Sequence, residues 1–364
     1  MKVATELPLD IIFSHILPRL PVKSIPRFKC VSKQWHSFLS SRMFAKTHLK
    51  FLQNDRKQNN LKLIVLSNTT PSNFCTIDCE SPDDGFTSIR SLPFEASREN
   101  ISLIASVNGL VCAGLKNVIN KNEFYDLVLW NPLTGDHKVL FRTSSYKIKQ
   151  RGFLFYYSSS EDDYKLVCIT RANDVYIYSL KSNSWTKVLH RVSGDWIPST
   201  ALNEGIYLIN QTGCQESCSI MKIDLRTKNF KIATLPLRNK ATNNGTSKDV
   251  HTVIVGGQVR LFERYCAGDM LMIEWLRWPS MKGGRPKGTM VNNYPKYSSP
   301  WFLRPIHMMK NGNYLMHSEI GNHLCIVDAK RQTKQFLCSC TTRYEDIQIG
   351  AKFTETLESP NQYN

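Results

Sequence analysis

The chain has 364 residues, of which 41% are hydrophobic and 21% charged, and its formal net charge is +17. These fractions are those of an ordinary soluble globular protein, long enough for one small module and one large domain. The longest uncharged stretch, residues 101–115, is too short for a membrane-spanning helix. Glu6 and Asp10 stand where a signal peptide would be apolar, so no signal peptide is expected. We therefore expect no membrane partner and a location in the cytoplasm and/or the nucleus.

The first predicted element is a short amphipathic helix that begins near Pro8, where a proline does not disturb the first turn. Its apolar residues have helical spacing and should share one wide face: Leu9, Ile12, Phe13, Ile16, Leu17 and Leu20. Pro18, Pro21 and Pro26 then divide the chain into short pieces. A further helical stretch has its apolar residues at Val31, Trp35, Phe38 and Leu39.

About fifty residues with this much apolar surface cannot bury it all within themselves, so we expect a helical partner. Residues 7–49, LPLDIIFSHILPRLPVKSIPRFKCVSKQWHSFLSSRMFAKTHL, also resemble the F-box of plant F-box proteins almost position by position. The resemblance implies a docking module that binds a Skp-type adaptor and, through it, the cullin scaffold of an SCF ubiquitin ligase.

Carried over by position, the resemblance implies these adaptor-binding residues: Leu7, Pro8, Ile16, Leu20, Pro21, Val22, Phe28, Val31 and Trp35. The alternative is that the same residues form the private core of a helical cap packed on the rest of the chain. Periodicity does not separate the two interpretations, because both bury the same face. The quoted motif favours docking.

Beyond a polar run at residues 54–60, the chain reads as short strands and turns. A tight turn that contains glycine and precedes an apolar strand recurs, and such turns supply the positive φ that close hairpins need. The four copies lie at Asn108-Gly109, Glu204-Gly205, Gly256-Gly257 and Asn311-Gly312.

A second signal is a strand that ends in a four-residue turn and returns as another strand. Its copies are LVLWNPLTGDHKVL, VYIYSLKSNSWTKVL, IMKIDLRTKNFKIATL and LCIVDAKRQTKQFL, and a degenerate copy is expected near Ile273–Leu276. The key residues Trp130, Tyr178, Ile223 and Val327 are 48, 45 and 104 residues apart, the last close to two periods.

A period near fifty residues with about four strands per unit predicts a β-propeller of about six blades. The alternatives are a β-sandwich or two barrel-like halves, but neither would require the motifs to recur at this regular spacing. A propeller must also close, so we expect the C-terminal FTETLES segment or the LKLIVLS strand near residue 61 to pair with the opposite end of the chain.

The segments SVNGLVC, LVLWNPLTG, DDYKLVCI, LNEGIYLI and FTETLES resemble the plant F-box-associated domain. The fold class is therefore α+β multidomain, with a small N-terminal all-α F-box followed by an all-β propeller-like domain. The predicted domains are residues 1–50 (F-box), 51–60 (linker), 61–358 (propeller-like substrate-recognition domain) and 359–364 (tail).

We expect no catalytic site, no cofactor and no metal. The eleven cysteines are an odd number, spread through predicted strands, and none of the close pairs has zinc-ligand spacing. The stretch GGRPKGT at 283–289 lacks the lysine, the preceding strand and the following helix of a phosphate loop. The sequence also contains no G-x-S-x-G or H-E-x-x-H motif.

The predicted function is a non-catalytic substrate-recognition subunit of an SCF-type ligase, whose β domain binds a target protein for ubiquitination. Two loops stand out, Arg238–Asp249 and Lys282–Arg304, and the second is basic and free of acidic residues, which suits an acidic or phosphorylated target. Its predicted target-binding residues are Arg285, Lys287, Tyr294, Lys296, Tyr297 and Trp301. The alternatives are a disordered insertion at this loop, a non-ligase F-box scaffold, or a basic propeller that binds nucleic acid. We expect a protein partner and no nucleic acid.

Overall fold

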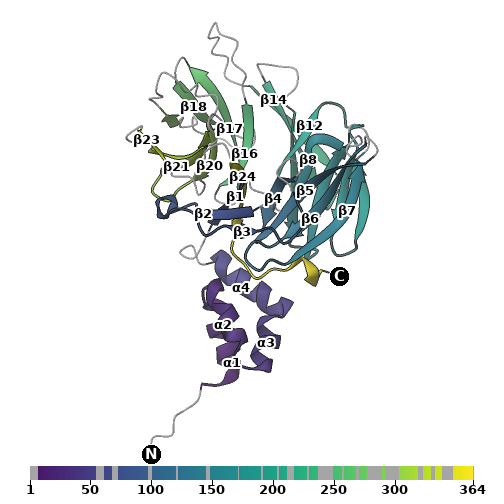
Figure 1. The fold of residues 1–364 in the computed structure, drawn as a ribbon. Coiled ribbons are helices and arrows are strands. Elements are labelled where there is room, and N and C mark those ends of the chain that lie inside the picture. The colour runs from purple at the N-terminus through teal and green to yellow at the C-terminus, as the bar shows by residue number, and fades with distance from the viewer. Residues whose placement is uncertain are drawn as a thin grey trace, which may run out of the picture.

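The computed structural model has a small helical module below a ring of β-sheets (Figure 1). It describes residues 7–54, 61–67, 73–96, 101–119, 122–144, 148–170, 172–189, 192–202, 205–210, 217–227, 229–236, 249–255, 258–267, 270–276, 289–291, 303–318, 323–328, 333–337 and 347–363. The predicted all-α module followed by an all-β propeller is confirmed.

The helical module is a series of short helices and turns. They are α1 (Leu9–Ile11), the π-helical turn η1 (Ile12–Ile16), the 3₁₀ turns η2 (Leu17–Arg19) and η3 (Val22–Ser24), α2 (Ile25–Lys29), α3 (Lys33–Leu39) and α4 (Arg42–Asn54). Serine caps start the last two helices: Ser32 Oγ accepts the Trp35 N–H at 3.2 Å, and Ser41 Oγ accepts the Phe44 N–H at 3.2 Å.

The predicted start of the first helix near Pro8 is confirmed, but its single apolar face is not. Leu17 is buried in the module core, whereas Ile16 and Leu9 are exposed. The π-helical turn explains the difference for Ile16, because it holds more residues per turn than an α-helix and rotates the side chains that follow. Leu9 begins α1, which lies at the lower part of the module in Figure 1.

The ring holds six four-stranded antiparallel sheets in the described residues, so about six blades, as predicted. Blades 1 to 3 consist of β24 (Ile347–Thr354), β1 (Leu61–Ser67), β2 (Asn73–Asp78), β3 (Arg90–Ser91); β4 (Ile101–Val107), β5 (Leu110–Ile119), β6 (Asn122–Trp130), β7 (His137–Ser144); and β8 (Ile148–Ser158), β9 (Asp163–Thr170), β10 (Val175–Ser179), β11 (Ser184–Leu189).

Blades 4 to 6 follow the same order. They consist of β12 (Trp196–Leu202), β13 (Gly205–Asn210), β14 (Ser217–Asp224), β15 (Phe230–Pro236); β16 (Asp249–Val255), β17 (Gln258–Ala267), β18 (Met270–Leu276), β19 (Thr289–Val291); and β20 (Leu303–Met308), β21 (Tyr314–Ser318), β22 (His323–Asp328), β23 (Thr333–Phe336). The repeated key residues all fall in third strands, β6, β10, β14 and β22, and the degenerate copy is β18.

The two ends of the ring sequence close it. β24 pairs antiparallel with β1, with Leu61 opposite Thr354 and Leu66 opposite Gln348. The first strands β24, β4, β8, β12 and β16 contact one another in turn, and Lys352 Nζ of β24 donates to the Ile306 carbonyl of β20 at 2.6 Å. Closure by the LKLIVLS strand is therefore confirmed, whereas only Phe353 and Thr354 of the FTETLES segment belong to β24.

The hydrophobic core lies between neighbouring blades. In β1, Leu63 and Val65 pack in one cluster with Leu315 of blade 6, and Ile64 packs in another with Val111 of blade 2. Both faces of this strand are buried, which explains why it reads as a continuous apolar run. Each blade thus depends on its neighbours for stability.

The ends of the third strands share one turn chemistry. In three blades the side-chain oxygen of an Asp or Asn accepts the backbone N–H two residues on: Asp78 (2.8 Å), Asn131 (2.8 Å) and Asp224 (2.9 Å). Such turns are favoured by short polar side chains, which accounts for the recurring strand-turn-strand motif.

The predicted positive φ holds for two of the glycine turns, Gly109 at 86° and Gly312 at 88°. It is wrong for Gly205, where a β-carbon would instead stand 3.2 Å from the Leu202 carbonyl oxygen. The pair Gly256-Gly257 lies outside the described residues. The Asn108–Gly109 turn joins the first two strands of blade 2 and contacts Gln53 of α4, so the first strands end on the helical side of the ring.

Two predicted boundaries differ from the structure. Helix α4 runs to Asn54, so the first part of the expected linker is helical, because Leu52 is buried and extends the apolar face of the helix. The expected tail is folded as well: it contains the 3₁₀ turn η9 (Pro360–Gln362), and Tyr363 is buried.

Candidate functional site: an apolar surface on the helical module

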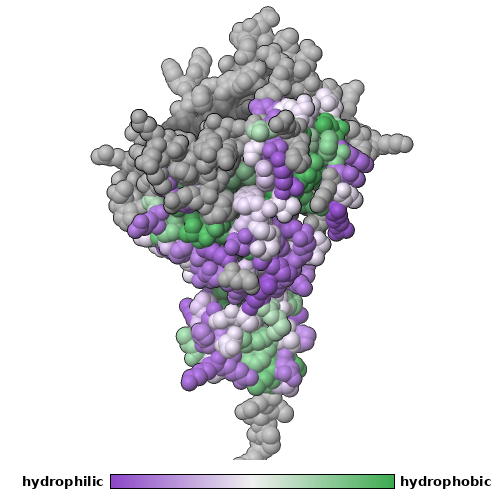
Figure 2. Space-filling view, turned by 90° about the vertical axis from the view of Figure 1, so that its right-hand side faces the viewer, coloured by the Kyte–Doolittle hydropathy of each residue, from purple (hydrophilic) through white to green (hydrophobic). Residues whose placement is uncertain are grey.

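The helical module exposes more apolar surface than its fold requires. Leu7 is 56% exposed, Leu9 49%, Ile16 40% and Val31 60%. Figure 2 shows hydrophobic areas on the module among hydrophilic ones. Exposed apolar surface gathered on a small module typically marks a protein interface.

These side chains are not needed for the module's own core. Leu17, Ile25, Leu39 and Phe44 are buried together there, with partly buried aromatic side chains around them. The Phe13 ring meets the Trp35 ring edge-on at 5.6 Å between centroids. The interpretation that the motif serves only as a private core therefore does not account for the exposed residues.

The predicted adaptor-binding residues divide into three groups. Leu7, Pro8, Ile16, Pro21 and Val31 are exposed. The half-buried ones, whose side chains pack against the module core, are Leu20, Phe28 and Trp35. Val22 is buried and so has no surface for a partner in this conformation. The role of all nine stays a prediction.

Sequence reasoning left Ile11 out of the set, although it is exposed beside Leu9 in α1. Ile11 is apolar but lies off the predicted apolar face of the helix, and this was the signal for a second apolar face. The same module exposes Arg19, Arg27 and Lys33. A partner surface that is apolar and acidic would therefore complement it.

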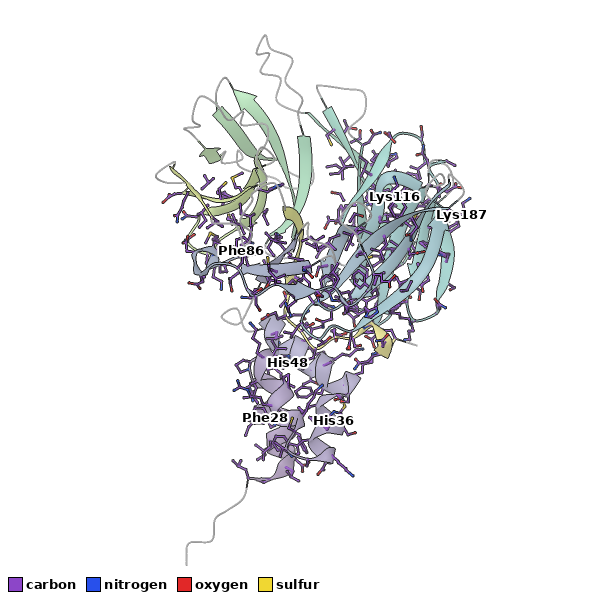
Figure 3. The ribbon with its side chains drawn as sticks, viewed as in Figure 1. Phe28, His36, His48, Phe86, Lys116 and Lys187 are labelled. Carbon is purple, nitrogen blue, oxygen red and sulfur yellow. The ribbon has the colours of Figure 1, made fainter. Side chains whose placement is uncertain are left out.

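His48 ties the module together on its ring side. The imidazole of His48 is buried in α4, and its Nε2 lies 2.9 Å from the Leu20 carbonyl oxygen, which can only accept a hydrogen bond. In Figure 3, His48 lies nearer to the propeller than Phe28 and His36 do. Burial lowers the pKa of His48, although the hydrogen bond to Leu20 opposes the shift.

The six predicted target-binding residues lie outside the described residues: Arg285, Lys287, Tyr294, Lys296, Tyr297 and Trp301. The first two precede β19 and the last four follow it. Because β18 and β19 pair antiparallel as third and fourth strands, the chain enters β19 on the helical side and leaves it on the opposite side. The expectation of a single loop is therefore wrong, and target binding by these residues stays a prediction.

The described part of the chain contains no group of three or more His, Cys, Asp or Glu side chains placed to hold a metal ion. The cysteines described there are free thiols, and burial raises the pKa of Cys79 and Cys168 to about 12. No described helix is both long and apolar enough to cross a membrane.

Comparison with protein families matches both parts of the chain. Residues 5–47 match the F-box domain, and residues 42–263 match the F-box associated beta propeller domain. An Arabidopsis thaliana F-box protein is 27% identical over 296 residues, covering 75% of this chain and 73% of that protein. An F-box/kelch-repeat protein of the same plant is 28% identical over 248 residues, covering 62% and 64%.

Among solved structures, a chain of a nidogen/laminin complex overlays with a TM-score of 0.47 and 9% identity, covering 80% of this chain and 97% of that one.

Proposed function

Because this chain belongs to the family of proteins with an F-box and an F-box-associated β-propeller domain, we propose that it is a substrate-recognition subunit of an SCF-type cullin ubiquitin ligase. The helical module would bind a Skp-type adaptor, and the ring would bind a target protein. The chain contributes proximity, because holding the target beside a ubiquitin-loaded enzyme raises the effective concentration of its lysines. Its place of action would be the cytoplasm and/or the nucleus.

The observation that carries the proposal is the exposed apolar surface of Leu7, Leu9, Ile16 and Val31. These residues lie within the F-box match, on the helical module below the ring (Figure 1). A partner that covered this surface would bury apolar area without disturbing the module core. The ring would then remain free for a target.

The test is binding of the full-length chain to a Skp-type adaptor, measured by calorimetry, with Ile16→Arg and Val31→Arg as variants. A charge placed in a desolvated apolar interface lacks a partner, so each variant should weaken binding by about a hundredfold or more. Leu20→Arg is a poorer test, because the Leu20 side chain packs against the module core and the variant would disturb the fold as well as the surface.

The matched control is Ile232→Arg, an equivalent change at a 51% exposed position of β15 in blade 4. It should leave adaptor affinity unchanged. If Ile16→Arg and Val31→Arg bound the adaptor as tightly as the natural chain, docking through this surface would be wrong. Co-purification of cullin through the adaptor then separates a ligase subunit from a non-ligase scaffold.

A further inference from the structure

The last described residues, 355–363, form a segment between the ring and the helical module that we call the strap. On the ring side, Asn131 Nδ2 donates to the carbonyl oxygens of Thr356 (3.0 Å) and Glu358 (2.7 Å). The Thr356 hydroxyl donates to the Asn108 carbonyl oxygen at 2.7 Å. Asn131 is fully buried, so the turn after β6 holds the strap with hydrogen bonds shielded from water.

On the other side, the strap binds the helical module. Leu357 packs against the module's core cluster. Gln362 Nε2 donates to the Ser40 carbonyl oxygen at 3.3 Å, and Lys23 Nζ lies 3.4 Å from a carboxylate oxygen of Glu355. The C-terminal segment thus supplies a side chain to a core built otherwise from the N-terminal residues.

Tyr363 anchors the end of the strap. Its ring is buried, and the guanidinium carbon of Arg42 lies 4.0 Å from the ring centroid. Its hydroxyl donates to Glu358 Oε2 at 2.9 Å, within the strap, and the Tyr164 ring of β9 meets it edge-on at 5.0 Å between centroids. Tyr363 therefore joins the first turn of α4 to blade 3.

A direct contact between module and ring adjoins the strap. Asp162 lies in the turn between β8 and β9. Its carboxylate accepts a hydrogen bond from Arg42 Nη2 at 3.1 Å and also forms an ion pair with Lys46. The Tyr157 hydroxyl donates to its other carboxylate oxygen at 2.6 Å. Both basic residues are on the side of α4 that faces the ring, and Arg42 contacts Asp162 and Tyr363 at once.

We propose that the strap makes the helical module and the ring one rigid body, with Arg42, Asp162 and Tyr363 as positioning residues that fix the angle between them. The rigid junction is inferred from the contacts alone. What it does for ubiquitin transfer rests on the proposed function: with this angle fixed, a target held on the ring stays at one place relative to the adaptor.

The test uses amide hydrogen exchange of the full-length chain with Arg42→Ala and Tyr363→Ala. Each variant should speed exchange in residues 42–54 and in the strap by about tenfold, because local opening sets the rate there. The paired strands β5 and β6 should keep their natural rates. Small-angle X-ray scattering of the same variants should show a broader distribution of intramolecular distances.

Two matched controls define the role. Lys50→Ala removes an exposed lysine one turn beyond Lys46 on the same helix and should exchange as the natural chain does, whereas Lys46→Ala should loosen the junction. Tyr363→Phe keeps the aromatic ring over which Arg42 lies. It should therefore keep most of the protection from amide exchange that Tyr363→Ala loses.

Natural exchange rates and scattering in both Arg42→Ala and Tyr363→Ala would overturn the proposal. So would uniformly faster exchange across the ring strands, since these residues would then stabilise the whole fold instead of the junction. Adaptor affinity should be unchanged in all of these variants. If the natural chain failed to bind the adaptor, the proposed function would fail while the exchange result would still decide the junction.

Discussion

Gly109 and Thr356 approach so closely that a β-carbon on Gly109 would stand 2.0 Å from the Thr356 hydroxyl oxygen. The backbone at Gly109 also has a φ of 86°, which strains any other residue. The first hairpin of blade 2 is thus built directly against the segment that follows the closing strand of blade 1.

Gly109→Ala should lower the free energy of unfolding by about 2–5 kcal/mol, as it adds both backbone strain and a collision. Gly135→Ala is the matched control, since Gly135 has a φ of 81° but nothing within 4 Å of an added β-carbon. It should cost about 1–2 kcal/mol, from strain alone. Denaturant unfolding of both variants measures the difference, and equal losses would show that the approach to Thr356 is unimportant.

Removal of β24 by truncation after Asp346 should unfold the ring cooperatively. The truncation leaves β1 paired only with β2 and exposes its other, apolar edge next to blade 6. Truncation after Ser359 is the control, because it keeps β24 and the strap carbonyls that Asn131 binds. Calorimetry should show loss of the ring's transition only in the chain that ends at Asp346; a preserved melting temperature there would disprove closure by β24.

His48 should make the helical module sensitive to acid. Its pKa is lowered by burial in the folded chain, so the unfolded chain takes up the proton first and stability falls as the pH drops below about 6.5. His48→Gln can still donate to the Leu20 carbonyl oxygen but does not titrate. Melting temperatures at about pH 5.5 and about pH 7.5 should therefore differ less in this variant than in the natural chain. Equal differences would remove His48 as the cause.

Glu358 should have the opposite pH dependence. Burial raises its pKa, although hydrogen bonds from Tyr363 and Tyr164 and the charges of Lys46 and Arg42 oppose the shift. The folded chain therefore holds this proton longer than the unfolded chain, and stability falls as the pH rises above about 4.5.

Glu358→Gln should flatten this pH dependence without lowering the melting temperature at neutral pH. An amide oxygen accepts the same hydrogen bonds from Tyr164 and Tyr363 while carrying no charge. Thermal unfolding across the range from about pH 4 to about pH 8 is the measurement. A large loss of stability at neutral pH would mean that the ionised carboxylate is the form the strap requires.

Local patterns in the sequence were sufficient for most of the fold. The spacing of Trp130, Tyr178 and Ile223 marks the third strands correctly, because each blade repeats the same buried strand and the same polar turn. The start of the first helix was also predictable from Pro8. The outward turn of Ile16 was not, because a π-helical turn has no signature in simple apolar spacing.

The strap was missed for a different reason. The sequence places residues 355–358 at the end of the propeller and residues 359–364 in a tail, and the apolar side chains of Leu357 and Tyr363 have no periodicity there. Their partners Arg42 and Asp162 lie far away in the sequence, so no local window connects them. The predicted target-binding residues were chosen for charge and aromatic content, but β19 divides them, and only strand pairing reveals that.

The position of β24 has a consequence for biosynthesis. The helical module precedes the ring in the sequence, yet both the strand that completes blade 1 and the segment that fastens the module follow all the other blades. During translation the ring must wait with an open edge until its last strand leaves the ribosome. A chain stopped before β24 would carry the helical module but no closed ring, and its exposed strand edge would favour aggregation.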